Sequence, residues 1–348
     1  MTIGFVINDV LTEKAGYTTV FLAMRMHNRG HRVYLIGVGD LCYDPSGQMG
    51  ATARRAPDKK FKDQKNYLTA VQGDESKVDQ LVAADLDVLM LRNDPAAEPT
   101  DRTWAQISGV IFGQLAAANG VIVVNDPNSL SDAVNKMYFQ HFPEKVRPRT
   151  LITRNPVQIR DFFKEQHERM ILKPLQGSGG QGVFVIEKEN ATNLNQIIEA
   201  ISRDGYVIAQ EFLPAAAEGD VRLFLMNGRP IEHKGKIAAM KRVGADDDVR
   251  NNVSAGGHVE KVKITDAMLD IVEVVRPKLV QDGMFFVGLD IAGDKLMEIN
   301  VFSPGGLNIS SQMEKTDFAE PVIDTLEQKV YYRKTYGDKV SNRTLAMM

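Results

Sequence analysis

Apolar runs alternate with helical patterns in the first part of the chain. The runs that predict strands lie at residues 3–7, 33–38, 87–91 and 121–124. Helical patterns lie between them, at residues 16–29 and at residues 104–119, where Gly120 ends the second helix. Strands that alternate with helices are typical of a parallel α/β layer. We therefore expect residues 1–128 to form an N-terminal α/β domain.

Residues 44–76 interrupt this alternation. The stretch contains Pro45, Gly47 and Gly50, together with four lysines and two arginines, and it shows little apolar periodicity. It is expected to form a long loop, either a lid over a site or a mobile insertion.

The pattern changes after Asn128. The sequence from Ser129 to Asp132 is a candidate helix start, and the helix that follows should contain Lys136. Short strands are then expected at residues 149–153 and 170–173. Further strands come in adjacent pairs, at residues 171–173 with 183–186, 221–226 with 231–237, and 285–291 with 295–301. Adjacent pairs imply antiparallel hairpins, so this half is predicted to be α+β.

Composition narrows the functional classes. The 348 residues include 42 basic and 45 acidic side chains, and a formal charge of −3 gives no general attraction to nucleic acid or to anionic lipid. No apolar run approaches the ~20 residues that cross a bilayer. The single cysteine, Cys42, is expected to be a buried or partly buried hydrophobic residue. With no exported leader evident, the expected location is the cytoplasm.

A glycine-rich segment follows the strand that ends near Lys173. It comprises Gly177, Ser178, Gly179, Gly180, Gln181 and Gly182. Glycines let successive backbone N–H groups approach one phosphate, although a flexible hairpin turn has a similar composition. Walker and dinucleotide-binding loops lead into helices, whereas this loop leads into another strand. Protein kinases need His-Arg-Asp and Asp-Phe-Gly motifs, which are absent. The pattern therefore predicts a hairpin flap over phosphates, with Lys173 reaching them from its first strand.

A second constellation lies on the predicted hairpin at residues 287–301. If the turn has three residues, Asp290 stands opposite Glu298 and shares a face with Asn300, while the other face is wholly apolar. A two-residue turn is expected to destroy this separation. Two carboxylates and an amide on one face suit Mg²⁺, which completes its shell with substrate phosphates. Surface acids remain an alternative for Asp290.

The order of these motifs resembles the ATP-grasp superfamily, and within it the bacterial glutathione synthetases over nearly the whole chain. The segments that carry the resemblance are Leu91-Arg-Asn-Asp-Pro95, Val124-Asn-Asp-Pro127, Asn135-Lys136, Ile171-Leu-Lys-Pro174, Gly219-Asp220-Val-Arg222, Arg250-Asn-Asn252, Ala255-Gly-Gly257 and Glu298-Ile-Asn300-Val-Phe-Ser303-Pro304. The resemblance implies an α/β fold in which a parallel pre-ATP-grasp domain precedes a two-lobed α+β ATP-grasp domain. The expected limits are 1–128, 129–327 with a lid lobe at 149–208 and a flap at 176–182, and a C-terminal tail at 328–348.

The resemblance also implies how ATP is bound. Lys136, Lys173 and the glycine loop would contact the phosphates, residues 210–213 would form the hinge around adenine, and Asp220 would lie near the ribose or phosphates. The hinge residues are Gln210, Glu211, Phe212 and Leu213. Mg²⁺, with Mn²⁺ as an alternative, would be held by Asp290, Glu298 and Asn300.

The implied reaction joins two small molecules through an acyl-phosphate. The γ-glutamyl-cysteine carboxylate attacks the γ-phosphate of ATP, and the amine of glycine then displaces phosphate to give glutathione. Arg222, Arg242 and Arg250 would meet the negative charge, which suits forked guanidinium groups. The substrate-binding residues carried over are Asn252, Gly256, Gly257, Ser303, Pro304 and Gly305. A homo-oligomer, possibly a tetramer, is also implied.

Three segments depart from the family pattern. Gly305 and Gly306 stand where these synthetases usually have Thr after Ser-Pro, and residues 13–17 and 44–76 also match poorly. All three could touch the peptide substrate. An ATP-grasp ligase for a different amino acid or peptide is therefore the alternative, and a nucleotide-binding module without turnover is a third hypothesis. A module without turnover should lack Lys173, Glu298 or Asn300, but the chain has all three.

Overall fold

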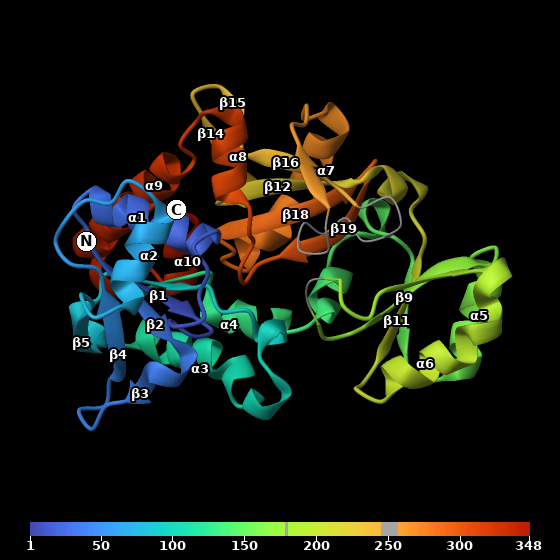
Figure 1. Ribbon diagram of the computed structural model, residues 1–348, viewed down its shortest axis with the longest axis horizontal. Coiled ribbons are helices and arrows are strands. Elements are labelled where there is room, and N and C mark those ends of the chain that lie inside the picture. Colours follow the sequence, from blue (N-terminus) through green and yellow to red (C-terminus); the bar gives the residue numbers. More distant parts are fainter. Residues whose placement is uncertain (178–179, 245–256) are drawn as a thin grey trace.

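The computed structural model describes residues 1–177, 180–244 and 257–348, which form three main β-sheets (Figure 1). A seven-stranded sheet belongs to the N-terminal part, and a four-stranded sheet forms a separate lid lobe. A six-stranded central sheet lies between them. Strands β14 (Glu232–His233) and β15 (Lys236–Ile237) form a further small sheet.

Four parallel strands form the centre of the N-terminal sheet, in the order β2-β1-β6-β7. They are β1 (Thr2–Ile7), β2 (Arg32–Gly37), β6 (Val88–Leu91) and β7 (Ile122–Val124). Helix α1 (Thr18–Asn28) connects β1 to β2, and α3 (Ala105–Ala118) connects β6 to β7. These predicted elements are confirmed.

The strand order of this sheet changes direction at β1. The chain passes from β1 to β2 on one side of the sheet and later returns to β6 on the other side. In open α/β sheets, ligands bind outside the carboxyl ends of the strands at such a point. Residues 8–17 follow β1 and Arg92 follows β6, so both segments border this crevice.

The prediction of a long loop at residues 44–76 was wrong. The stretch and its flanks form β3 (Leu41–Tyr43), β4 (Met49–Arg55), α2 (Gln64–Gln72) and β5 (Lys77–Val82). Strand β4 runs antiparallel to β2, β3 and β5. Its buried face consists of Met49, Ala51 and Ala53, so the alternation of a half-buried strand is present. Two of the three side chains are too small to give a clear apolar pattern.

The lid lobe is an antiparallel sheet in the order β10-β9-β11-β8. Its strands are β8 (Thr150–Thr153), β9 (Arg169–Pro174), β10 (Phe184–Glu187) and β11 (Val207–Glu211). Helices α5 (Pro156–Glu165) and α6 (Leu194–Ser202) pack on it through a core that includes Phe162, Ile198 and Leu172. Because Leu172 pairs with Phe184 across β9 and β10, the predicted hairpin around the glycine loop is confirmed.

The central sheet has the strand order β17-β16-β12-β18-β19. These strands are β12 (Asp220–Met226), β16 (Ala239–Val243), β17 (His258–Glu260), β18 (Phe286–Ala292) and β19 (Lys295–Asn300). We expected residues 221–226 to pair with 231–237, but β12 pairs with β18 on one side and with β16 on the other, and only its end pairs with β13 (Arg229–Pro230). The expected partner residues are divided among short strands, including β14 and β15. Helices α7 (Asp266–Gln281) and α8 (Leu307–Glu314) complete this part.

Lys136 lies in a separate short 3₁₀ helix and not in one continuous helix that starts near Ser129. Helix α4 (Pro127–Leu130) is capped by Asp126, whose side chain accepts from the Ser129 N–H, and not by Ser129 itself. The 3₁₀ helices η5 (Ser131–Ala133) and η6 (Lys136–His141) follow. Asn135 caps η6 by accepting from the Met137 N–H, so Lys136 is its first residue.

The C-terminal residues form helices that pack on the N-terminal part. Helix α9 (Ala319–Tyr336) continues through the expected boundary at residue 327, and α10 (Asn342–Met347) follows it. Arg29, directly after α1, pairs with Asp324 and Glu327 of α9, each at 2.6 Å. Figure 1 shows α9 and α10 beside α1 and the N-terminal sheet. The tail is therefore not a separate appendage.

The single cysteine of the chain lies at the surface. Cys42 lies on the edge strand β3 and is exposed, so the expectation of a buried or partly buried cysteine was wrong. None of the helices in the described ranges is long and apolar enough to cross a membrane.

Candidate active site

Strands β18 and β19 bring the predicted acidic residues together. Asp290 pairs with Glu298, and Gly288 pairs with Asn300, so all three polar side chains lie on one face as predicted. The turn has only two residues, however, because Ala292 pairs with Lys295. Met297 is an extra residue that forms a β-bulge and restores the register beyond it. The expectation that a two-residue turn would destroy the separation was therefore wrong.

Four charged side chains form a buried network on the central sheet. Asp290 accepts from Nε and Nη2 of Arg222, the latter at 2.8 Å, and from Nη2 of Arg242 at 2.8 Å. Arg242 also donates to Asp220 at 2.7 Å. Nη1 of Arg222 donates to the Gly305 carbonyl at 3.3 Å. Arg222 is thus committed to positioning Asp290 and residue 305.

Charges within this network shift the pKa values of its acids in opposite directions. Burial alone would raise the pKa of Asp290, but the guanidinium groups of Arg222 and Arg242 outweigh it and hold the pKa at about 2. Burial and the charge of Asp290 raise the pKa of Asp220 to about 6, against the attraction of Arg242. Asp290 is therefore the carboxylate that stays charged throughout the physiological range.

Glu298 differs from Asp290 in having no hydrogen bond or ion pair within the described ranges. Asn300 Nδ2 donates to Asp290 Oδ2 at 3.2 Å, which leaves the Asn300 carbonyl oxygen available. Among the described residues there is no group of three His, Cys, Asp or Glu side chains that could hold a metal. The donor set fits a hard cation that takes its other ligands from phosphates and water, and does not fit one held by protein alone.

Lys173 faces this hairpin from the lid sheet. Its Nζ donates to Gln210 Oε1 at 2.9 Å, and Gln210 Nε2 in turn donates to Thr150 Oγ1 at 3.1 Å. Desolvation lowers the pKa of Lys173 to about 8, opposed by the charge of Glu298 and reinforced by that of Lys136. Lys136, Lys173 and Glu298 are thus close enough to influence one another although they come from three different elements.

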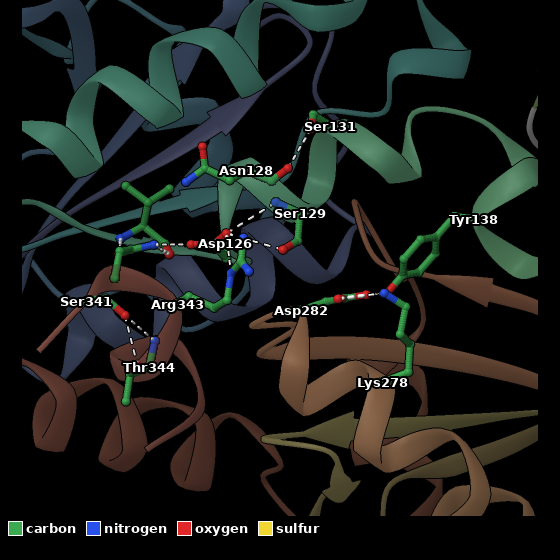
Figure 2. A network of polar contacts seen from close by, with 12 residues as sticks. Asp126, Asn128, Ser129, Ser131, Tyr138, Lys278, Asp282, Ser341, Arg343 and Thr344 are labelled. Atoms are coloured by element: carbon green, nitrogen blue, oxygen red, sulfur yellow. Dashed lines mark hydrogen bonds and ion pairs between the residues drawn. The ribbon is translucent and has the colours of Figure 1, made fainter. Parts of the chain in front are cut away.

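A polar network fixes the short helix that carries Lys136. Tyr138 donates to Asp282 at 2.7 Å, and Lys278 of α7 donates to the other oxygen of Asp282 at 2.8 Å (Figure 2). The Lys136 N–H donates to the Leu175 carbonyl at 3.1 Å. Lys136 Nζ reaches the carbonyl of Gly177 at the start of the glycine loop.

The glycines of the loop adopt the conformations for which glycine is needed. Gly177, Gly180 and Gly182 have φ values of 127°, 75° and 68°, a region that other residues rarely adopt. Predicted residues that lie outside the described part are Ser178, Gly179, Arg250, Asn252 and Gly256. Gly257 is described and directly precedes β17.

The predicted hinge connects the lid sheet to the central sheet. The Glu211 N–H donates to the Arg149 carbonyl at 2.9 Å, and the Arg149 N–H donates to the Glu211 carboxylate at 2.9 Å. The guanidinium of Arg169 lies 3.7 Å from the ring centre of Phe212. Leu213 follows and is half-buried. These contacts hold the backbone between the two sheets.

A cavity of about 120 Å³ lies where these elements meet. Its lining includes Lys136, Lys173, Gly177, Gln210, Glu298, Asn300 and Ser303. The lid sheet, η6 and the β18–β19 hairpin thus bring predicted phosphate-binding and metal-binding residues to one site.

Sequence reasoning did not assign a role to Arg92. This buried side chain donates through Nη2 to the Pro304 carbonyl at 2.9 Å, through Nη1 to the Phe302 carbonyl at 3.4 Å, and through Nε to Thr19 at 3.2 Å. It therefore fixes the loop that contains the expected substrate residues Ser303, Pro304 and Gly305. The signal was present, because Arg92 belongs to the motif at residues 91–95, but the motif alone does not identify the partner.

Comparison with protein families agrees with this geometry over most of the chain. Residues 1–131 match the N-terminal domain of prokaryotic glutathione synthetase, and residues 135–315 match its ATP-grasp domain. The chain belongs to the prokaryotic glutathione synthetase family. It is 34% identical over 320 residues to glutathione synthetase from Yersinia pestis, covering 91% of this chain and 94% of that one. It is 32% identical over 332 residues to the Gloeobacter violaceus enzyme, covering 94% and 96%.

Solved structures with lower sequence identity share the fold. D-cycloserine synthetase DcsG superposes with a TM-score of 0.60 at 13% identity, covering 94% of this chain and all of that one. The ATP-grasp ligase PsnB, in complex with a precursor variant, Mg and ADP, gives 0.59 at 18% identity, covering 94% and 98%. The predicted fold, an α/β N-terminal domain followed by an ATP-grasp domain, is therefore confirmed.

Proposed function

We propose that this protein is an ATP-dependent ligase that joins γ-glutamyl-cysteine to glycine, yielding glutathione, ADP and phosphate. The observation that carries the proposal is the convergence of Lys136, Lys173 and Glu298 on one cavity. They lie in a chain that two family models of glutathione synthetase match at residues 1–131 and 135–315.

Each side of the cavity has a distinct task in this proposal. Lys136 and Lys173 bind the phosphates of ATP, and residues 210–213 hold the adenine. Within the described ranges Lys173 donates to the neutral Gln210, and the charge of Glu298 does not offset the desolvation of the ammonium, so an arriving phosphate would stabilise its charged form. The glycine loop then covers the phosphates with its backbone N–H groups.

The substrate carboxylate attacks the γ-phosphate, and the amine of glycine displaces phosphate from the resulting acyl-phosphate. Negative charge develops on oxygen in both steps. Arg242 can meet that charge, because its Nη1 makes no hydrogen bond within the described ranges while Nε and Nη2 hold it in place. Arg222 acts through Asp290 and Gly305 and is a positioning residue. Arg250 keeps the role that the resemblance implies.

Mg²⁺, or Mn²⁺ in its place, would be held by Glu298, Asn300 and Asp290. Among the described residues, Asp290 Oδ1 accepts from a single donor, Arg222 Nε, which leaves a lone pair for a cation. The cation would neutralise the charge of the phosphates during transfer. We also propose that the enzyme acts in the cytoplasm as a homo-oligomer.

The test is phosphate release from ATP and Mg²⁺ with γ-glutamyl-cysteine and each amino acid in turn, with mass spectrometry of the products. Release with glycine alone, and glutathione as product, is the expected result. Release with another amino acid would instead indicate a ligase with a different acceptor, and the loop at 303–307 would then be the expected cause of the changed specificity. No release with any pair would contradict the proposal of a ligase for this donor.

A further inference from the structure

A half-buried carboxylate borders the crevice between β1 and β6 without a partner. The backbone carbonyl of Glu13 accepts from Gln72 Nε2 at 3.2 Å, but its carboxylate makes no hydrogen bond or ion pair within residues 1–177, 180–244 and 257–348. The positive charge of Arg92 attracts the Glu13 carboxylate, but the two side chains are not hydrogen-bonded. All of the described side-chain hydrogen bonds of Arg92 go to Thr19 and to the carbonyls of Phe302 and Pro304. Burial raises the pKa of Glu13 to about 7, against the attraction of Arg92. A carboxylate in such a position is costly unless a donor arrives.

A second acceptor that lacks a donor among the described residues lies on α8, next to the segment at residues 13–18. Asn308 donates from Nδ2 to the Gly16 carbonyl at 3.1 Å, which fixes the orientation of its amide. Its Oδ1 is buried and makes no hydrogen bond within the described part of the chain. Within the described ranges, the carboxylate of Glu13 and the side-chain oxygen of Asn308, whose Nδ2 donates to the nearby Gly16, thus both lack donors.

The backbone connects this segment to the substrate loop. The Leu307 N–H donates to Thr18 Oγ1 at 3.1 Å, and Arg92 holds the carbonyls of Phe302 and Pro304. The carboxyl-end crevice of the N-terminal sheet therefore opens on the loop at 303–307. A primary ammonium group, which has three donors and no acceptor, is the chemical group that matches this pair of acceptors.

We propose that Glu13, with the Oδ1 atom of Asn308, binds the ammonium group of an amino-acid substrate in the crevice between β1 and β6. The inference rests on the proposed function, since both the γ-glutamyl head of the donor and the acceptor glycine carry such a group. Glu13 would thereby help to select amino acids and γ-glutamyl peptides among small molecules.

Steady-state kinetics of the full chain carrying Glu13→Gln test this proposal. The exchange keeps the shape of the side chain and removes its charge. The KM for one amino-acid substrate should rise roughly tenfold to a hundredfold, the range for one charge-assisted hydrogen bond. The KM for ATP and the melting temperature should stay unchanged. Glu13→Asp, which keeps the charge, should recover part of the loss. Asp74→Asn, which removes an exposed carboxylate of the same domain, is the matched control.

The two sources of the ammonium give different results. If it belongs to the donor, the KM for γ-glutamyl-cysteine rises, and glutaryl-cysteine, which lacks the amino group, binds equally weakly to wild type and variant. If it belongs to the acceptor, the KM for glycine rises instead. Unchanged KM values for both, or an equal rise in the KM for ATP, would overturn the proposal. The wild-type protein is measured first with the same substrates, and this measurement tests the proposed function by itself. If the wild type uses another pair of substrates, the Glu13→Gln variant is tested with that pair.

Discussion

The central sheet and the lid sheet carry charged groups in different states. On the central sheet, Arg222, Arg242, Asp220 and Asp290 neutralise one another in a buried network. On the lid sheet, the side chain of Lys173 has one hydrogen bond within the described ranges, to the neutral Gln210. The side chains of the first arrangement pair with one another, whereas Lys173 makes no ion pair with a described residue, and the charge of Glu298 does not offset its desolvation.

This difference indicates that the central sheet and the lid sheet have different roles in ATP binding. A buried ion-pair network has fixed geometry, because moving any member leaves a desolvated charge. A desolvated lysine with a depressed pKa gains most when a phosphate arrives. The network on the central sheet is therefore expected to have its final geometry before ATP binds, and the lid supplies the groups that respond to ATP.

Removing one member of the buried network on the central sheet should have the largest effect. Asp290→Asn leaves Arg222 and Arg242 with Asp220 as their single acid in the network. Breaking a buried pair in this way costs about 3–5 kcal/mol, so we expect the free energy of unfolding to fall by that amount and phosphate release to be abolished. Urea unfolding and the phosphate assay measure the two effects. Asp294→Asn, in the exposed turn of the same hairpin, is the control and should change neither. An unchanged free energy of unfolding for Asp290→Asn would contradict the conclusion that the network is fixed before ATP binds.

Glu298→Gln should separate catalysis from stability. Glu298 has no partner within the described ranges, so its loss should leave the melting temperature unchanged. If it holds the cation, phosphate release should fall on the order of a hundredfold or more, because several kcal/mol of charge stabilisation are weakened. The Mg²⁺ concentration for half-maximal activity should also rise. Activity equal to that of the control Glu218→Gln would refute the metal assignment.

The pKa of Lys173 makes ATP binding sensitive to alkaline pH. Its value of about 8 lies below the ordinary value of 10.5, so the amine loses its proton, and its attraction for phosphate, as the pH rises through 8. The dissociation constant of ATP should then increase by at most about tenfold per pH unit above 8. Calorimetric titrations between pH 7 and 9.5 measure this. Lys173→Arg keeps its charge and should flatten the dependence, whereas Lys164→Arg on the exposed face of α5 should reproduce the wild-type curve.

The sequence predicted the acidic hairpin better than its turn. Alternation correctly placed Asp290, Glu298 and Asn300 on one face. It could not distinguish a three-residue turn from a two-residue turn with a bulge at Met297, because both place Asp290 opposite Glu298 and Gly288 opposite Asn300. That choice depends on local backbone hydrogen bonds, which the pattern of side chains does not record.

Two other features were hidden for different reasons. Strand β4 escaped prediction because Ala51 and Ala53 on its buried face are small. The contacts of Arg92 join residues more than 200 positions apart, and no local pattern contains such a pairing. Long-range contacts of this kind decide where the N-terminal crevice meets the loop at 303–307.

The smallest predicted effect concerns the hinge. The guanidinium of Arg169 stacks on Phe212 at 3.7 Å and also pairs with the half-buried Glu187 at 2.7 Å. Arg169→Lys can keep the ion pair, but an ammonium group stacks less well on an aromatic ring than the planar guanidinium does. Stacking of this kind contributes about 0.5–1 kcal/mol at exposed sites, so the KM for ATP should rise roughly twofold while kcat stays constant. Arg203→Lys, in an exposed pair with Glu199 of the same lobe, should leave both constants unchanged. A change in kcat alone would mean that Arg169 affects the motion of the lid and not the position of the hinge.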